Sequence, residues 1–294
     1  GGVSGSLEVD FATHRVSVIT RVRGLGLEPL SPVLARLLGG QVEAEFVGDF
    51  PWEEPAGRFT LQSAQGVAGE VTLGSQGLVA SLRRPNRWSF SAEVKQEKRS
   101  YSGSASLRVD SLSLLLKDLL GSEVPVEGEL EAQMRLALGP SGPPSLFGTI
   151  TKAVLVAEGE KVSLTNPAPF TLQGLHFELP GLDLSGPSAQ LFLRGSRQLD
   201  GRLSGNISAS VPASLVGILW REAAPRGRLE VVGEISGTEA APRVEGVLRL
   251  EGGSLRIPGL PAPVTGIDGV AELAGDVMSL RKVRFAFQGG TGTC

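Results

Sequence analysis

The chain has 294 residues, of which 41% are hydrophobic and 20% are charged, so its composition is that of a folded protein and not of a disordered one. It carries 28 Lys and Arg against 31 Asp and Glu, a net charge of -3, and shows no basic stripe of the kind that indicates nucleic-acid binding. The 40 glycines, 19 prolines and 5% aromatic residues predict many turns and a mainly aliphatic apolar face.

Alternation of apolar and polar residues with a period of two begins near the N-terminus and continues along the chain, which predicts β-strands. Gly, Pro, Asn and Asp separate the alternating segments, and this favours an antiparallel sheet. In chain order, the apolar positions include Leu7, Val9, Phe11; Val16, Val18, Thr20, Val22; Val42, Ala44, Phe46; Trp88, Phe90, Ala92, Val94; Leu203, Ile207, Ala209, Val211; Leu229, Val231, Ile235; Val244, Leu248, Leu250; and Val283, Phe285, Phe287.

The longest alternating segment is VPVEGELEAQMRLALG, at residues 124–139. Its apolar face holds Val124, Val126, Leu130, Ala132, Met134, Leu136 and Leu138. A strand of this length would reach about 50 Å, which is much longer than the usual strand of five or six residues. We therefore expect a bend or bulge near Gly128.

Three segments break the alternation and predict short, very apolar helices. The first is LSPVLARLLGG at residues 30–40, with Ser31 as its N-cap. The second is DSLSLLLKDLLG at residues 110–121, with Asp110 or Ser111 as its N-cap. The third is SVPASLVGILWREAAPRG at residues 210–227.

The recurrence of a helix, a long strand and a Pro-then-Gly strand start indicates an internal repeat. The expected organisation is one continuous, repeat-built sheet over residues 1–294, with approximate units 1–100, 101–196 and 197–294. The first residues, GGVSGSLEV, contain neither Met nor a signal sequence, and no apolar run is long enough to span a bilayer. We expect a fragment of a longer protein, with any membrane anchor outside it.

The residues that catalysis or metal binding would need do not form a recognisable pattern. The two histidines, His14 and His176, stand in no ligand-like spacing, and the single cysteine is Cys294. The sequence therefore predicts no enzyme, no metal and no cofactor. The densest basic stretch is LRRPNRW at residues 82–88, interpreted as a solvated strand end, with contact to a phosphate or lipid headgroup as the alternative.

Several stretches are similar to the translocation and assembly module family TamB, within the wider AsmA-like group. They are GRLEVVGEISGT (227–238), PRVEGVLRLEGGSLRIPGL (242–260), GIDGVAELAGDVMSLRKVRFAFQGGTG (266–292) and KVSLTNPAPFTLQGLHFELPGLDLSGPSAQLFLRGS (161–196). The resemblance covers most of residues 100–292, and LSPVLARLLGGQVEAEF (30–46) follows the same order of elements.

The resemblance implies a long, curved β-sheet shaped like a half-pipe with an apolar interior, and no catalytic residues. It also implies a bridge-like lipid carrier in the periplasm, whose full-length form is anchored in the inner membrane. A barrel partner of the TamA type in the outer membrane would be contacted through regions outside this chain. A role in the assembly of outer-membrane proteins is implied as well.

A sheet with one apolar face must cover that face, because burying a large apolar side chain is worth roughly 1.5–3 kcal/mol. Either a second sheet packs on it as a sandwich, or one curled sheet forms a trough that acyl chains fill. Alternation alone does not separate the two. The uninterrupted alternation, the aliphatic lining and the recurring helices, together with the resemblance, favour the trough.

The sequence thus predicts an all-β protein, an elongated, curved antiparallel sheet with a few short amphipathic helices. Its predicted function is to carry lipid, with phospholipid as the expected class, through contacts with the acyl chains. The alternatives are a scaffold for outer-membrane β-barrel assembly or secretion, and a ligand-free sandwich or stalk. The candidate lipid-contacting residues are Val16, Val18, Val22, Val42, Phe46, Phe90, Val94, Val126, Leu130, Met134, Leu136, Leu203, Ile207, Leu229, Val231, Ile235, Leu248, Leu250, Phe285 and Phe287.

Overall fold

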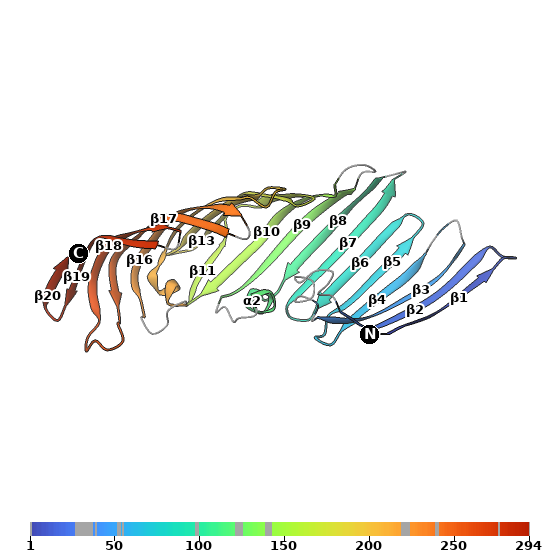
Figure 1. The fold of residues 1–294 in the computed structure, drawn as a ribbon, viewed down its shortest axis with the longest axis horizontal. Helices are drawn as coiled ribbons and strands as arrows, with labels where there is room; N and C mark the ends of the chain where they lie inside the picture. The colour runs from blue at the N-terminus through green and yellow to red at the C-terminus, as the bar shows by residue number, and fades with distance from the viewer. Residues whose placement is uncertain are drawn as a thin grey trace. The chain divides into compact units, whose positions relative to one another are not determined.

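The computed structural model describes residues 2–26, 38, 40–51, 54, 56–97, 100–120, 126–138, 143–218, 224–238, 241–275 and 277–293. The fold is all-β, with antiparallel strand pairs throughout, so the predicted class is confirmed (Figure 1). The chain divides into two compact units, Gly1–Val124 with Gly128–Gly148, and Pro125–Glu127 with Thr149–Cys294. The three-repeat organisation stays a prediction.

The first unit is a row of nine strands in which each strand pairs with the next one in the sequence. Short turns make this order possible, because an antiparallel neighbour needs only a few connecting residues. The strands are β1 (Gly2–Asp10), β2 (Arg15–Gly26), β3 (Gln41–Pro51), β4 (Gly57–Ser63), β5 (Ala68–Gly74), β6 (Gly77–Arg84), β7 (Trp88–Glu97), β8 (Ser100–Val109) and β9 (Glu127–Leu138).

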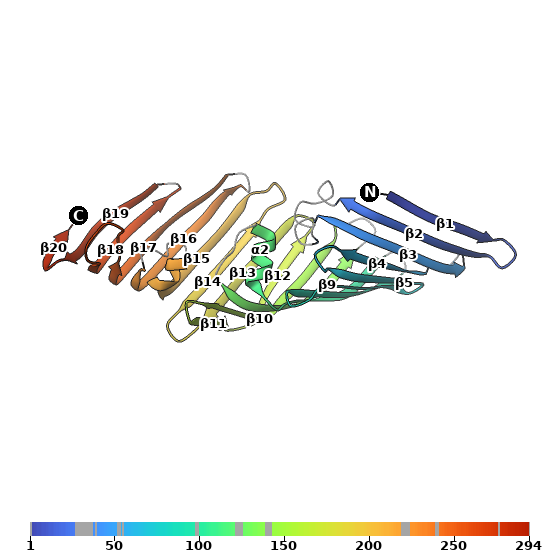
Figure 2. The ribbon, with the colours of Figure 1, turned by 90° about the horizontal axis from the view of Figure 1, so that it is seen from below.

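The second unit is built in the same way, except at its start, where the two short strands β11 and β12 both pair with β13. From β13 to β20 each strand again pairs with the next. The strands are β10 (Ser145–Ala157), β11 (Glu160–Leu164), β12 (Ala168–Gln173), β13 (His176–Ser185), β14 (Gln190–Arg197), β15 (Leu203–Pro212), β16 (Arg226–Thr238), β17 (Ala241–Leu255), β18 (Val264–Ala274), β19 (Val277–Phe287) and β20 (Gly290–Thr293). Within each unit the strands lie side by side in one layer (Figures 1 and 2).

The predicted helix at residues 110–121 is confirmed as α2 (Leu112–Leu120). Ser111 is its N-cap, since the Ser111 hydroxyl accepts a hydrogen bond from the Leu114 backbone N–H at 3.4 Å. The backbone N–H groups of Asp110 and Ser111 also donate to the Arg87 carbonyl, at 2.8 and 3.3 Å. These bonds tie the start of the helix to the turn between β6 and β7.

Of the other two predicted helices, one is mostly outside the described residues and one is present only in part. The segment at residues 30–40 lies outside the described residues apart from Leu38, which is helical, and Gly40. The prediction at residues 210–227 is right only in part over its described residues, because the helix there begins later and is of the 3-10 type. β15 runs on to Pro212, which pairs with Arg228 of β16, and Ala213–Ile218 forms the 3-10 helix η1. Strand pairing continued where the sequence pattern had indicated a helix start.

The main hydrophobic core of the first unit lies where α2 packs against the sheet. Its buried members are Leu38, Val42, Val67, Trp88 and Val109. Leu112 and Leu115 of α2 pack against this cluster, as do several leucines of the strands. The helix therefore covers one end of the sheet face, near the ends of β6, β7 and β8.

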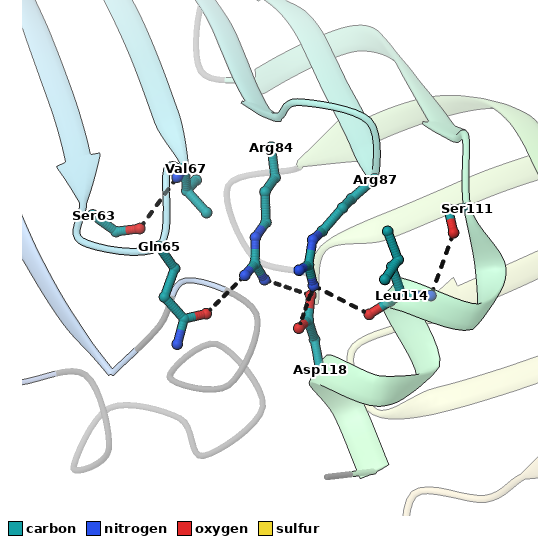
Figure 3. Close-up of polar contacts among 8 residues, drawn as sticks. All are labelled: Ser63, Gln65, Val67, Arg84, Arg87, Ser111, Leu114 and Asp118. Atoms are coloured by element: carbon teal, nitrogen blue, oxygen red, sulfur yellow. Dashed lines mark hydrogen bonds and ion pairs between the residues drawn. The ribbon is translucent and has the colours of Figure 1, made fainter. Parts of the chain in front are cut away.

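Two arginines hold α2 in place through one carboxylate (Figure 3). Arg84 forms an ion pair with Asp118 and donates to the Gln65 side-chain oxygen at 2.9 Å. Arg87 Nη1 lies 2.6 and 2.7 Å from the two Asp118 oxygens and 3.5 Å from the Leu114 carbonyl oxygen. Arg84 is only 7% exposed, so the interpretation of this stretch as a solvated strand end is wrong for that residue. The sequence pattern did not show that a helix covers this strand end.

No helix of the described part is long and apolar enough to cross a bilayer.

We predict that Asp118→Ala destabilises the first unit by about 3–5 kcal/mol, because it removes the carboxylate that both guanidinium groups contact in a largely buried place. Asp110→Ala is the matched control. Asp110 pairs with Arg108 on the exposed surface, where such a pair is worth at most about 1 kcal/mol. Urea unfolding of the three proteins, followed by circular dichroism, measures both changes. We call the contacts of Arg84 and Arg87 with Asp118 the clamp. Equal losses of stability in the two variants would contradict its role in holding α2.

Candidate functional site

The apolar side chains of the first unit share one face of its sheet. Residues directly opposite each other in an antiparallel pair point to the same side, so the registers assign each strand's alternating set to a face. On β3 this set is Val42, Ala44 and Phe46. In the same order, these residues lie opposite Leu25, Val22 and Thr20 of β2. On the other side they lie opposite Ser63, Leu61 and Phe59 of β4. Following the same registers, the face continues through Val71, Leu73, Leu78, Leu82, Phe90, Val94, Ala105, Leu107, Val109, Leu130, Met134 and Leu136.

This face is buried at one end and accessible at the other. Under α2, Val42, Val67 and Val109 are almost fully buried. At the other end of the face, Val94 of β7 and Met134 and Leu136 of β9 keep partial exposure, and Leu73 of β5 belongs to the exposed side chains. Within the described part of this unit, the strands belong to one layer, and no second described layer of strands covers the face. We call this accessible part, on β5 to β9, the open strip of the first unit.

The opposite face of the first unit is mainly polar and ion-paired, although Ile19, Val47 and Val79 on it are exposed. Arg15 pairs with Asp49 at 3.0 Å, and Arg58 pairs with Glu70 at 2.8 Å. The Arg15 hydrogen bond lowers the pKa of Asp49, which keeps this exposed carboxylate ionised. The strands therefore carry their ion pairs on one face and most of their apolar side chains on the other.

The second unit repeats this separation. In register order its apolar face includes Leu182, Leu184, Leu191, Leu193, Ile207, Ala209, Leu229, Val231, Ile235, Val244, Leu248, Leu250, Ala271 and Leu273. Leu184 is almost fully buried, but most of the others are only half-buried. The other face carries Arg, Glu and Ser residues, as in Arg249 opposite Glu230.

Glycines on the face of the second unit let neighbouring side chains lie close to the sheet. Gly233 faces Ile207 across the β15–β16 pair, and a Cβ on Gly233 would lie 3.2 Å from the Ile207 Cγ2. Gly205 faces Ile235 in the same pair, and there the distance from a Cβ to the Ile235 Cβ would be 3.8 Å. The lining is thus shallow at these positions and stays aliphatic.

The structure places nineteen of the twenty candidate residues on these two apolar faces. In the first unit these are Val16, Val18, Val22, Val42, Phe46, Phe90, Val94, Leu130, Met134 and Leu136. In the second unit they are Leu203, Ile207, Leu229, Val231, Ile235, Leu248, Leu250, Phe285 and Phe287. Val126 lies just before β9 and is half-buried. Contact of any of them with lipid stays a prediction.

The sequence reasoning missed part of the second face, on β13 and β14. The alternation of β13 is interrupted by a bulge at Pro180 and Gly181, so Leu179 and Leu182 lie on the same face although they are three residues apart. The Pro-Gly pair is the signal that could have indicated this bulge. The Arg84–Asp118–Arg87 cluster was missed too, because the sequence contains no signal that joins residues 31 positions apart.

Chemically, the open strip offers aliphatic contact and little else. Among the described residues no group of three or more His, Cys, Asp or Glu could hold a metal ion. The surface depressions of the first unit, such as the one lined by Arg21, Glu43, Glu45 and Thr60, include the polar face and are wide open. The arrangement therefore suits a ligand with extended apolar chains and no fixed polar anchor along most of its length.

Comparison with protein-family models, with curated proteins and with solved structures found no match for this chain.

Proposed function

We propose that the chain carries lipid, with phospholipid acyl chains lying on the apolar face of each unit. The observation that supports this most is the accessible aliphatic face backed by a hydrated, ion-paired face in the same strands. An accessible apolar face of this kind indicates an apolar ligand or partner. The sequence resemblance to TamB over residues 100–292 supports the same proposal.

The proposed mechanism is passive. Each half-exposed Leu, Ile or Val gains free energy when an acyl chain replaces water, at roughly 25 cal/mol per Å² of apolar surface. Similar side chains recur at neighbouring positions, such as Val231 opposite Leu248 and Leu229 opposite Leu250, so a chain exchanges equivalent contacts as it moves across the strands. Headgroups remain in water. Movement between inner and outer membrane across the periplasm, supporting outer-membrane biogenesis with a TamA-type barrel partner, belongs to this proposal.

A second candidate function is a scaffold that pairs with strands of outer-membrane proteins. β1 favours it: this strand pairs with β2, and no other described strand lies along its outer edge. Val3 and Leu7 of β1 are 74% and 68% exposed. A free edge with exposed apolar side chains readily accepts another strand.

We predict that Met134→Asp and Leu248→Asp each lower the amount of co-purified phospholipid at least about tenfold. A carboxylate at these half-exposed positions stays hydrated in the empty protein, but it would lose water when an acyl chain covers it. Native mass spectrometry of the purified protein, with lipid extraction, measures the effect.

The chain offers a control next to each position. Gln133→Asp and Val247→Asp place the same carboxylate on the polar face of the same strands, and Val247 is itself 45% exposed. These variants should keep their lipid. Equal loss from both faces would contradict lipid binding on the apolar face. So would a wild-type protein that carries no lipid after purification and takes up none from vesicles.

For the scaffold, we predict that Leu7→Lys abolishes capture of an unfolded outer-membrane β-barrel protein. A lysine on an edge strand opposes pairing with another strand. Val232→Lys is the control, because Val232 is 63% exposed but lies on an interior strand. Photo-crosslinking of the barrel protein to β1 checks this, and capture that Leu7→Lys does not change would exclude β1 as the binding edge.

A further inference from the structure

The second unit exposes apolar side chains at the turns along one edge of its sheet. Successive strands run in opposite directions, so the turns β12–β13, β14–β15 and β18–β19 lie at the same edge (Figure 2). The first two turns carry Leu175 and Leu199, which are 63% and 69% exposed. At the third turn, Val277 and Met278 are 63% and 60% exposed. We call this row of four side chains the turn edge.

Backbone contacts hold these turns and leave the apolar side chains unused. Arg197, two residues before Leu199, donates a hydrogen bond to the Leu175 carbonyl and so joins two neighbouring turns. Beside the third turn, the Gly275 N–H donates to the Val244 carbonyl at 2.9 Å. The exposure of the turn edge therefore belongs to turns with fixed backbone contacts, and it places apolar side chains in water at a cost.

The apolar face of the second unit opens toward the turn edge. Near that edge, Leu172 and Val244 on this face belong to the exposed side chains. At the opposite edge, Leu184 of β13 and Ala213 of η1 are almost fully buried. An apolar chain can therefore reach the face from the turn edge, whereas the packed end leaves it no room.

The spacing of the exposed side chains favours a bilayer over a protein as the partner. Neighbouring strands are about 4.8 Å apart, so the turn of Leu199 is about 10 Å from that of Leu175, and the turn of Val277 is about 20 Å farther along. A specific protein interface buries a contiguous area of about 1,000 Å² or more, which separate turns do not supply. A bilayer accepts separate apolar side chains at its headgroup boundary, because its lipids rearrange around each of them.

Charge does not attract this edge to anionic lipid. Within three residues of the turns at 174–175, 198–201, 239–240 and 275–276, the sequence has three arginines against five acidic residues, a net charge of -2. They are Arg197, Arg202 and Arg243, and Glu178, Asp200, Glu239, Glu272 and Asp276. Contact with a bilayer at this edge would therefore depend on the apolar side chains.

We infer that the turn edge inserts its apolar side chains into the headgroup boundary of a bilayer, and that lipid passes there onto the apolar face of the second unit. The side chains that enter the boundary stand at the end where that face is accessible. This inference rests on the proposed lipid-carrying function and adds the place where the protein meets a membrane.

The first test measures binding of the full chain to phosphatidylcholine vesicles by sedimentation. Wild-type protein should bind, and Leu175→Ser and Leu199→Ser should each lower the partition coefficient about tenfold, because each removes one large apolar side chain that the boundary would bury. Val232→Ser is the matched control, since Val232 is 63% exposed but lies on the polar face of an interior strand. Leu260→Ser is a second control, in the loop at the opposite edge. Both controls should bind as wild type does.

Two further measurements locate the contact and its chemistry. In a Cys294→Ser background, an environment-sensitive fluorophore on Leu199→Cys should shift to the blue on vesicle binding, and one on Val232→Cys should not. Vesicles of phosphatidylglycerol should bind the protein no better than those of phosphatidylcholine, and salt should not weaken binding. Leu199→Ser should also slow lipid uptake from vesicles about tenfold, in step with its lower partition.

The outcomes separate this inference from the proposed function. Wild-type protein that takes up lipid but shows no partition dependent on Leu175 and Leu199 overturns the turn edge and leaves lipid carriage standing. Partition as expected in a protein that takes up no lipid overturns lipid carriage and the passage of lipid at this edge. Binding that requires phosphatidylglycerol and falls with salt overturns the apolar contact. If wild-type protein dimerises without vesicles and Leu199→Ser does not, the partner is a second copy and the bilayer assignment is wrong.

Discussion

The strict period of two along antiparallel strands is the constraint on which the rest of this structure depends. Each strand directs its apolar side chains to one side, and the registers keep that side common to neighbouring strands, as in Leu82–Phe90–Leu107 of the first unit. A shift by one residue in any pair would place leucines on the ion-paired face. The separation of faces is therefore a property of the whole row of strands and is not local to any one of them.

The helix α2 covers one end of the apolar face of the first unit. The covered end forms the core, and the rest of the face stays accessible. α2 buries Trp88 and Val109, which supplies the first unit with a core, and it leaves Met134 and Leu136 partly exposed farther along. Holding a helix by buried charge is a demanding solution, because two guanidinium groups must be desolvated against one carboxylate. Of the two arginines, Arg84 is buried while the Arg87 side chain keeps 24% of its surface exposed, so a charged group borders the aliphatic surface at this end of the sheet.

Much of the fold could be predicted from the sequence, because alternation, turn residues and helix caps are local signals. The strands around Val42–Phe46 and Leu229–Ile235 and the helix capped by Ser111 follow from them. What could not be predicted depends on contacts between distant residues. Burial of Arg84 requires knowing that Asp118 lies above it, and the continuation of β15 to Pro212 requires its pairing with Arg228. Likewise, alternation marks an apolar face but does not say how much of it another element covers.

A uniform aliphatic lining has a specific consequence for a ligand that moves. Contacts with Leu and Val side chains are nearly equivalent from one strand to the next, so they favour occupancy without favouring a position. Under α2 such an exchange is blocked, because Trp88 and Val109 are already packed against the helix side. A ligand that gains its free energy from apolar contact would therefore occupy the accessible part of the face and leave the core under α2 intact.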